Sequence, residues 1–315
     1  MSEKHTFSRR SFVKGIGVAA AIPLLPQVLH AEDTAYAGKA GTPHKVLTCN
    51  IRVALPDDDA KGFGWGARKK LCVDVMRAQK PDIICMQEVL RVQNEDLKQA
   101  FPNFFSYGFE GPEMDAHTEG YHGIAKNPIF FLGQRYELLS AGSYWLSDTP
   151  HIGGSMSWGT ARARHVNWVR LKDKKSGLDF RVVNLHLDHQ SQEAREKQIN
   201  MVMDEVKQYP AGYQQLLTGD FNVGVDNAVY EIIRNEGWTD SYAAIHGEGE
   251  AGFTVHSFQG EDYPKKDKRK KIDFIFHRGG GRALSANIIK DHKGNLYPSD
   301  HYFVAADLML GAEKS

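Results

Sequence analysis

Four short strings of the sequence set carboxylates and imidazoles among large apolar residues. They are Val183–His189, Leu217–Asn222, Lys271–Phe276 and Pro298–His301. A charged group buried beside apolar residues is costly unless it is paired or binds a metal. A lone strand-end aspartate can cap a turn and a lone histidine is often structural, so no single string establishes a site. Their joint occurrence predicts one active site built from distant parts of the chain.

Strand periodicity indicates which side chains of these strings share a face. In the first string, the two-residue period puts Asn184, His186 and Asp188 on one face of a strand and two leucines on the other. Asp220 and Asn222 share a face in the same way at the end of the next predicted strand. Polar side chains that share a face at a strand end can converge on one ligand.

Further oxygen and imidazole groups complete the set. Asp273 interrupts an apolar strand, and Asp300 and His301 stand side by side just before the last predicted strand. Asn50 and Glu88 lie at the ends of two earlier apolar runs. Carboxylate and amide oxygens are hard ligands that suit Mg²⁺ or Mn²⁺. The imidazoles would then serve in phosphate binding and proton transfer rather than in holding zinc.

Alternating strand-like and helix-like segments from His44 onward must position these groups. Strands are predicted at 45–53, 82–89, 128–132, 136–146, 165–171, 179–188, 214–218, 272–277 and 302–308. Helices are predicted at 65–79, 92–100, 192–208 and 227–235, the third with Ser191 as its N-cap. Because strands outnumber helices and several neighbours can pair as hairpins, the pattern favours mixed sheets with helices packed outside.

In their order along the chain, these groups resemble the endonuclease/exonuclease/phosphatase superfamily. The resemblance rests on Asn50, Gln87-Glu88, Asn184–His189, Gly219–Asn222, Ile272-Asp273 and Ser299–His301. Ser143–Pro150 also resembles a string found in a branch of secreted bacterial members. The family implies a four-layer α/β/β/α sandwich, with two mixed β-sheets packed face to face, helices outside and the site at one end of the strands.

The resemblance also implies which residues bind the metal and the substrate. The position of Glu88 would hold Mg²⁺ or Mn²⁺, with help from Asn50 and Asp300. Three further residues would contact the substrate: Arg164, Asp188 and Tyr144. The loops at 108–123 and 151–163 would set its specificity.

The remaining residues of the resemblance would carry the chemistry. Asp220 would activate or orient the attacking water, while Asn222 and His186 would bind the phosphoryl group. His301, paired with Asp273, would act on the phosphate or carry a proton. No serine or cysteine stands in a convincing setting for a nucleophile, so we expect direct attack by water on a phosphate mono- or diester.

The substrate class stays open between three alternatives. A phosphorylated small molecule, such as a sugar, inositol or lipid-headgroup phosphate, is favoured. A secreted nuclease is the second alternative, although the chain has 39 basic and 39 acidic residues and is not basic overall. Family nucleases that act at damaged DNA often carry an acid where this chain has Arg52, which weakens that specialised activity. A non-catalytic binding protein is the third, but none of the core groups is missing.

The N-terminal segment predicts export. Two adjacent arginines, Arg9 and Arg10, precede Phe12, Lys14 and a mildly apolar stretch, as in a twin-arginine signal. Cleavage could follow Ala31 or Ala37. We therefore expect residues 1–37 to be signal and spacer, residues 38–315 to form one catalytic domain, and the enzyme to work in the periplasm or outside the cell.

Other features predict ordinary structural roles. Cys49, Cys72 and Cys85 are an odd number and are expected to be buried free thiols. No window approaches the roughly 18 apolar residues of a membrane span. Trp65 and Arg68 on the first long helix are expected to pack rather than to reach the site. The number of subunits is not indicated.

Overall fold

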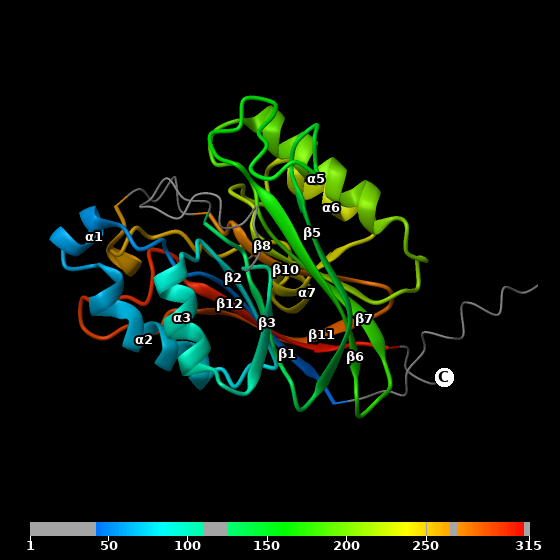
Figure 1. The fold of residues 1–315 in the computed structure, drawn as a ribbon, viewed down its shortest axis with the longest axis horizontal. Helices are drawn as coiled ribbons and strands as arrows, with labels where there is room; N and C mark the ends of the chain where they lie inside the picture. Colours follow the sequence, from blue (N-terminus) through cyan, green and yellow to red (C-terminus); the bar gives the residue numbers. More distant parts are fainter. Residues whose placement is uncertain (1–41, 110–124, 250, 265–269, 312–315) are drawn as a thin grey trace, which may run out of the picture. The chain divides into compact units, whose positions relative to one another are not determined.

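A computed structural model describes residues 42–109, 125–249, 251–264 and 270–311. The predicted signal at 1–37 lies outside these ranges, as does most of the loop predicted at 108–123. That residues 38–315 form one domain stays a prediction. Within the described ranges, the strands form two mixed sheets of six strands each (Figure 1).

The first sheet has the order β11-β12-β1-β2-β4-β3. Its strands are β1 (His44–Asn50), β2 (Ile83–Gln87), β3 (Phe104–Tyr107), β4 (Ile129–Leu132), β11 (Arg282–Ile289) and β12 (Phe303–Met309). β1 and β2 are parallel, and the other neighbours are antiparallel. The parallel pair therefore ends at the same edge of the sheet, where Asn50 and Gln87 are partners.

The second sheet has the order β5-β6-β7-β8-β10-β9. Its strands are β5 (Tyr136–Trp145), β6 (His165–Asp173), β7 (Asp179–His186), β8 (Gln215–Asp220), β9 (Thr239–Asp240) and β10 (Asp273–Arg278). β7 and β8 are its parallel pair. Each sheet thus has two adjacent strands that end together and can present polar side chains at one edge.

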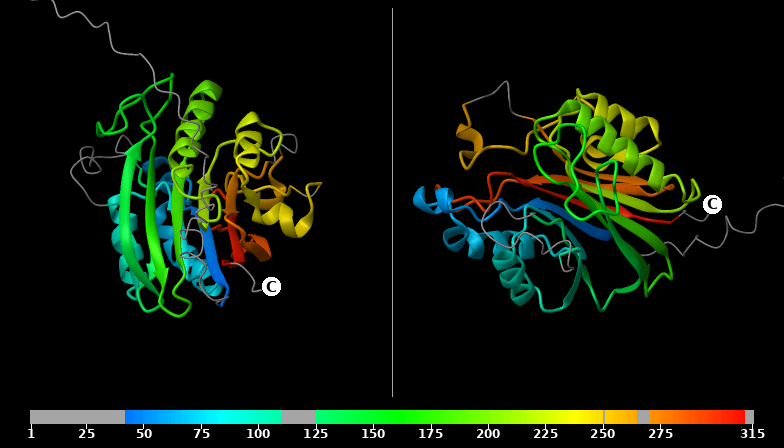
Figure 2. Two further views of the ribbon diagram at one scale, coloured as in Figure 1. Left: turned by 90° about the vertical axis from the view of Figure 1, so that its right-hand side faces the viewer. Right: turned by 45° about the horizontal axis from the view of Figure 1, so that its top comes forward.

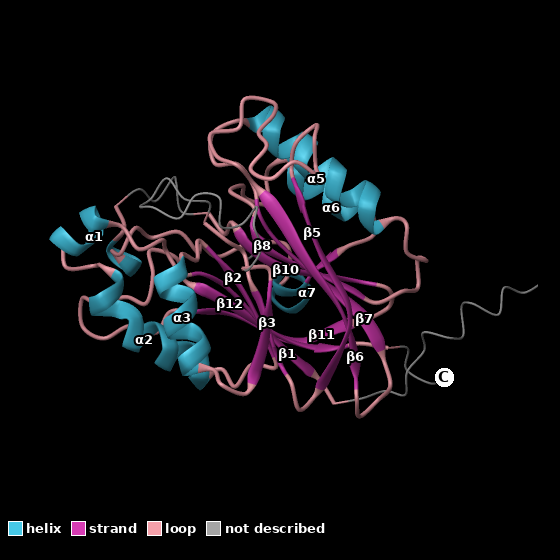
Figure 3. Cartoon of the chain, in the orientation of Figure 1, coloured by secondary structure: helices cyan, strands magenta, loops and turns pink. Residues whose placement is uncertain are grey.

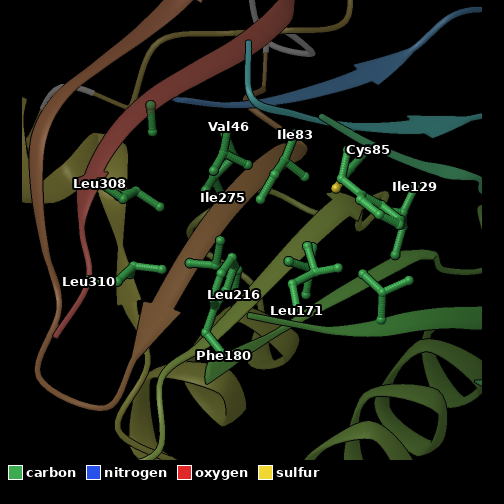
Figure 4. Close-up of a cluster of buried hydrophobic side chains, with 14 of the residues drawn as sticks. Val46, Ile83, Cys85, Ile129, Leu171, Phe180, Leu216, Ile275, Leu308 and Leu310 are labelled. Carbon is green, nitrogen blue, oxygen red and sulfur yellow. The ribbon is translucent and has the colours of Figure 1, made fainter. Parts of the chain in front are cut away.

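Three apolar clusters hold the layers together. Val46, Ile83, Leu171, Leu216 and their neighbours fill the space between the sheets (Figure 4). A second cluster packs the first sheet against α2 (Trp65–Ala78) and α3 (Arg91–Ala100), and a third packs the second sheet against α5 (Gln192–Val206) and α6 (Ala228–Asn235). The two pairs of helices lie on opposite sides of the sheets (Figures 2 and 3). The predicted four-layer sandwich is confirmed.

Most of the predicted elements are present, with shifted ends. Ser191 is the N-cap of α5, since its Oγ accepts the Ala194 N–H at 3.1 Å. The short elements α1 (Pro56–Ala60), α7 (Ser241–His246), β3, β9 and β11 were not predicted. Across the described ranges, no helix combines the length and apolar character needed to cross a bilayer.

The three cysteines are buried and free, as predicted. The turn after β4 does not join paired strands, because β4 belongs to the first sheet and β5 to the second. That turn carries the chain from one sheet to the other.

Candidate active site

The register of the second sheet brings three predicted site residues together. His186, the last residue of β7, is the partner of Asp220 at the end of β8. Asp220 is in turn the antiparallel partner of Asp273, the first residue of β10. Side chains of directly paired residues point to the same face of a sheet. The structure therefore gathers an imidazole and two buried carboxylates at one edge.

Asn50 joins this edge to the first sheet. Its Nδ2 donates to Glu88 Oε1 at 3.0 Å and to Asp220 Oδ2 at 2.9 Å. Glu88 Oε2 also accepts the Val53 N–H at 2.9 Å. Glu88 has a φ of 66°, a left-handed backbone that is uncommon outside glycine and costs energy. The hydrogen bonds hold the Glu88 carboxylate beside Asp220.

Asp220 has an environment suited to exchanging a proton near neutral pH. Burial, together with the nearby Asp273 carboxylate, raises the pKa of Asp220 to about 7. His186 Nε2 lies 3.4 Å from Asp220 Oδ2. Burial and the nearby Arg164 lower the pKa of His186 well below its ordinary value, so this imidazole is neutral.

His301 and Asp273 form the predicted pair. His301 Nδ1 lies 2.9 Å from Asp273 Oδ2. Burial alone would lower the pKa of His301, but the Asp273 carboxylate outweighs it and raises that pKa well above its ordinary value. His301 is therefore a cation at neutral pH, while His186 is not. The site holds two imidazoles in opposite charge states, only one of which can give up a proton.

Asn222 and Asp300 border the same space. Asn222 has a φ of 54°, and its N–H donates to Asp220 Oδ1 at 2.9 Å while its Nδ2 donates to the Leu187 carbonyl at 3.0 Å. Asp300 Oδ2 lies 3.4 Å from Arg52 Nη1. Arg52 also holds Asp58, with Nε 2.8 Å from Asp58 Oδ2. The residue noted as a departure from the family nucleases thus lies at the site as a fixed cation.

A cavity of about 460 Å³ opens over these groups. Its floor includes Glu88, His186, Asp220, Asn222, Asp300 and His301. Its other wall comes from the loop between β5 and β6 and includes Met156, Arg162 and Arg164. Arg164 Nη2 lies 3.2 Å from His189 Nδ1. The loop between β5 and β6 therefore adds two arginines to a floor that already holds three carboxylates.

Several lining residues were not assigned a role from the sequence. Arg162 and His189 line the cavity beside Arg164, and Val255 and Ile272 add apolar surface. The sequence held a signal for two of them. Arg162 lies two residues before Arg164, and His189 is the last residue of the string that contains His186.

Two predicted substrate contacts are placed elsewhere. β7 ends at His186, so Asp188 lies beyond the strand and does not share its face. Its buried carboxylate accepts four hydrogen bonds, from Thr160 Oγ1, Ala161 N, Gln190 N and Ser191 N, at 2.7 to 2.8 Å. Tyr144 packs in the apolar cluster beneath α5 and α6. Neither residue lines the cavity, so we no longer expect either to contact substrate directly.

A buried amide network stands behind the site. Gln87 Nε2 donates to Asn184 Oδ1 at 2.7 Å, and Asn184 Nδ2 donates to the Met86 carbonyl at 2.9 Å. Thr218 Oγ1 donates to the Val183 carbonyl at 3.1 Å. The first two bonds link β2 in the first sheet to β7 in the second, and the third ties β8 to β7. They fix the distance between the two edges that carry Glu88 and His186.

Two groups of side chains could hold a metal ion. Ligand atoms of Glu88, His186 and Asp220 lie within 4.8 Å of one another, and so do those of Asp220, Asp273 and His301. Asp273 Oδ1 is buried and, within the described residues, has no hydrogen-bond partner. Asp300 belongs to neither group. This oxygen-rich donor set fits a hard divalent cation, with Glu88 and Asp220 as the central carboxylates.

Comparisons with known proteins agree with the fold. The family model described as Endonuclease/Exonuclease/phosphatase family matches residues 47–301. An endonuclease/exonuclease/phosphatase structure from Bacteroides vulgatus is 31% identical, with a TM-score of 0.74 over 86% of this chain and 100% of that one. The mannosyl-6-phosphatase structure from Bacteroides thetaiotaomicron is 26% identical, with a TM-score of 0.72 over 84% and 99%. The protein YbhP of Escherichia coli K12 is 26% identical over 67% of this chain and 79% of its own length.

Proposed function

The chain belongs to the endonuclease/exonuclease/phosphatase family, and we propose that it is an exported, metal-dependent phosphoesterase acting on a phosphorylated small molecule. Members of this family hydrolyse phosphate esters. The observation that carries the proposal is the convergence of Glu88, Asp220 and His301 on one cavity. These residues come from both sheets and are separated by most of the chain.

We propose Mg²⁺ or Mn²⁺ as the cofactor. Glu88 would hold the ion, with Asp220, His186 and the Asn50 amide beside it and Asp300 at the cavity floor. A bound divalent cation would polarise the phosphoryl group and offset its negative charge. The carboxylate oxygens favour such a hard ion over zinc.

The charge states of the side chains support a role for each. Asp220, with a pKa of about 7, can accept a proton from an attacking water at neutral pH. His301, held protonated by Asp273, can donate a hydrogen bond or a proton to a phosphoryl oxygen. Asn222 can donate to the phosphate as well. Loss of one such donor typically lowers turnover on the order of 10²- to 10³-fold.

The cavity favours a compact, polar substrate. Within the described residues, its lining contains no phenylalanine, tyrosine or tryptophan. Proteins that bind single-stranded nucleic acid commonly stack bases on such rings. Arg162, Arg164 and His189 would instead contact hydroxyl and phosphate oxygens. A sugar or inositol phosphate fits this chemistry better than a nucleic acid, and the mannosyl-6-phosphatase relative supports a sugar phosphate.

The proposal is tested with the purified protein lacking residues 1–37, assayed with Mg²⁺, with Mn²⁺ and with chelator. The substrates are sugar phosphates, inositol phosphates, sphingomyelin, RNA and plasmid DNA. We expect hydrolysis of a small phosphorylated molecule that chelator abolishes. Cleavage of DNA or RNA alone would establish the nuclease alternative, and hydrolysis that persists in chelator would refute metal dependence.

Site variants identify the residues responsible. Glu88→Ala and His301→Ala are each expected to lower turnover at least about 100-fold while the protein stays folded. Glu137→Ala and His292→Ala make the same changes at exposed positions and should keep full activity. Near-normal turnover in either site variant would contradict the roles assigned to those residues.

We propose that residues 1–37 direct twin-arginine export. The support is the sequence pattern around Arg9 and Arg10. Replacing both with lysine keeps the charge, and we expect it to retain the enzyme in the cytoplasmic fraction. Equal amounts of the wild type and of this variant in the periplasmic fraction would refute the proposal.

A further inference from the structure

Arg68 on α2 is fully buried, and its guanidinium is bound by backbone carbonyls. Nε donates to Phe63 O at 2.9 Å, Nη2 to Arg52 O at 2.6 Å, and Nη1 to Pro298 O at 3.0 Å and to Ile51 O. None of its hydrogen bonds within the described residues goes to a carboxylate. A buried charge without a direct counterion is costly. Its presence therefore calls for an explanation beyond ordinary packing.

Three of the four carbonyls that bind Arg68 belong to two segments of the site. Ile51 and Arg52 follow Asn50 at the end of β1, and Pro298 precedes the turn that carries Asp300 and His301. One guanidinium thus spans segments that are more than 200 residues apart in the chain. Arg68 therefore links the two segments through their backbone carbonyls, in addition to the ion pair between the Arg52 and Asp300 side chains.

The segment after β1 needs such support. Arg52 has a φ of 57°, a left-handed backbone that persists only where the surroundings hold it. Its carbonyl accepts from Arg68 and also from Gln93 Nε2 at 2.8 Å. The Gln93 Oε1 accepts the Ala54 N–H at 3.2 Å. Arg68 and Gln93 together fix the course of the chain that carries the Asn50 and Arg52 side chains.

Only arginine has the donor geometry for this position. Its planar fork offers donors in several fixed directions, whereas lysine offers one nitrogen on a flexible stem. The ring centroids of Trp65 and Phe258 lie 5.1 and 5.9 Å from the guanidinium carbon, within the range of cation–π contacts. The carboxylates of Asp300 and Glu88 are near enough to stabilise its charge from the site side.

We propose that Arg68 is a positioning residue, which sets the spacing between the Asn50 and Asp300 sides of the site and thereby its affinity for a divalent cation. Its effect on turnover rests on the proposed function, but its effect on metal affinity does not. Replacing a residue that orients metal ligands typically lowers metal affinity or activity by about 10- to 100-fold. We expect a change in that range, acting on kcat more than on KM.

The test compares Arg68→Lys with Arg135→Lys, a control at a second buried arginine, which differs from Arg68 in also donating to the Asp82 and Asp173 carboxylates. Arg135 is also buried and donates to the carbonyls of Thr42 and Pro43, at the opposite end of β1 from the site. Mn²⁺ affinity is measured by calorimetry, and amide hydrogen exchange is followed at 51–54 and 299–302. Arg68→Lys should weaken Mn²⁺ binding at least about tenfold and speed exchange in both segments. Arg135→Lys should leave Mn²⁺ affinity unchanged.

The outcomes separate this proposal from the proposed function. Unchanged Mn²⁺ affinity in Arg68→Lys, or an equal loss in both variants, would overturn the positioning role. If the wild type binds Mn²⁺ but hydrolyses no phosphate ester, the proposed function fails while the comparison of affinities still decides the role of Arg68. If the wild type does not bind Mn²⁺, both proposals fail. If Arg68→Lys does not fold, Gln93→Met tests the same segment, and unchanged affinity there overturns the proposal.

Discussion

Replacing Asp188 with asparagine isolates the contribution of one buried carboxylate behind the cavity. Asp188 accepts hydrogen bonds from Thr160 and Ala161 on one side and from Gln190 and Ser191 on the other. It therefore ties the loop that leads to Arg164 to the start of α5. Asparagine has nearly the same volume, but it has no charge and presents an N–H group where an acceptor is needed.

The size of the effect follows from the pKa of Asp188. Burial alone would raise this pKa, but the N–H groups of Ser191 and Gln190 and the Thr160 hydroxyl lower it from 3.8 to about 2. That shift corresponds to about 2.4 kcal/mol of stability at pH 7. Adding the cost of an unsatisfied buried donor, we expect Asp188→Asn to lower the free energy of unfolding by about 3 to 4 kcal/mol.

The direction of the pKa shift determines how the stability loss in Asp188→Asn depends on pH. The pKa of Asp188 is lower in the folded than in the unfolded protein. The carboxylate therefore stabilises the fold fully above the unfolded pKa, and this stabilisation is lost as pH falls toward the folded pKa. The part of the stability loss that comes from the charge of Asp188 should therefore shrink to about half by pH 3. Urea unfolding of the wild type and Asp188→Asn at pH 7 and pH 3 measures it. Asp204→Asn, at an exposed position on α5, serves as the control.

Two results would refute this reasoning. One is a loss below about 1 kcal/mol at pH 7, less than a single unsatisfied group is expected to cost. The other is a loss of equal size at pH 7 and pH 3. If the proposed function holds, KM should also rise, because the loop that precedes Arg164 loses its anchor, while Mn²⁺ affinity should stay unchanged.

Two further predictions concern pH. A metal binds the deprotonated carboxylate, and Asp220 has a pKa of about 7, so Mn²⁺ affinity should fall by up to about tenfold per pH unit below pH 7. Calorimetry at pH 6 and pH 8 tests this prediction, and equal affinities would contradict it. Burial lowers the pKa of His165 to about 3, so only the unfolded state takes up its proton below pH 6.5, and stability falls by about 2 kcal/mol by pH 5. His165→Phe should flatten that decline in urea unfolding, whereas an unchanged slope would show that His165 does not cause it.

The fold could be predicted from the sequence because its cues are mostly local. Apolar periodicity located the long helices, and Ser191 predicted the start of α5. Short elements such as β9 and β11 were missed, because two residues or a half-exposed edge strand leave little apolar pattern. The assignment of β4 and β5 to different sheets was also out of reach, since it depends on distant strand partners.

By itself, the sequence indicated several of the groups that line the cavity. Carboxylates and imidazoles among apolar residues must be paired or bound, whatever the fold, and Glu88, His186, Asp220 and His301 all line the cavity. Only the tertiary structure decided where each group points. β7 ends at His186, which lines the cavity, whereas Asp188, two residues further on, lies behind it. Arg68 meets the Pro298 carbonyl only after folding. Strand ends and contacts between distant segments are set by packing of the whole chain, which no local pattern records.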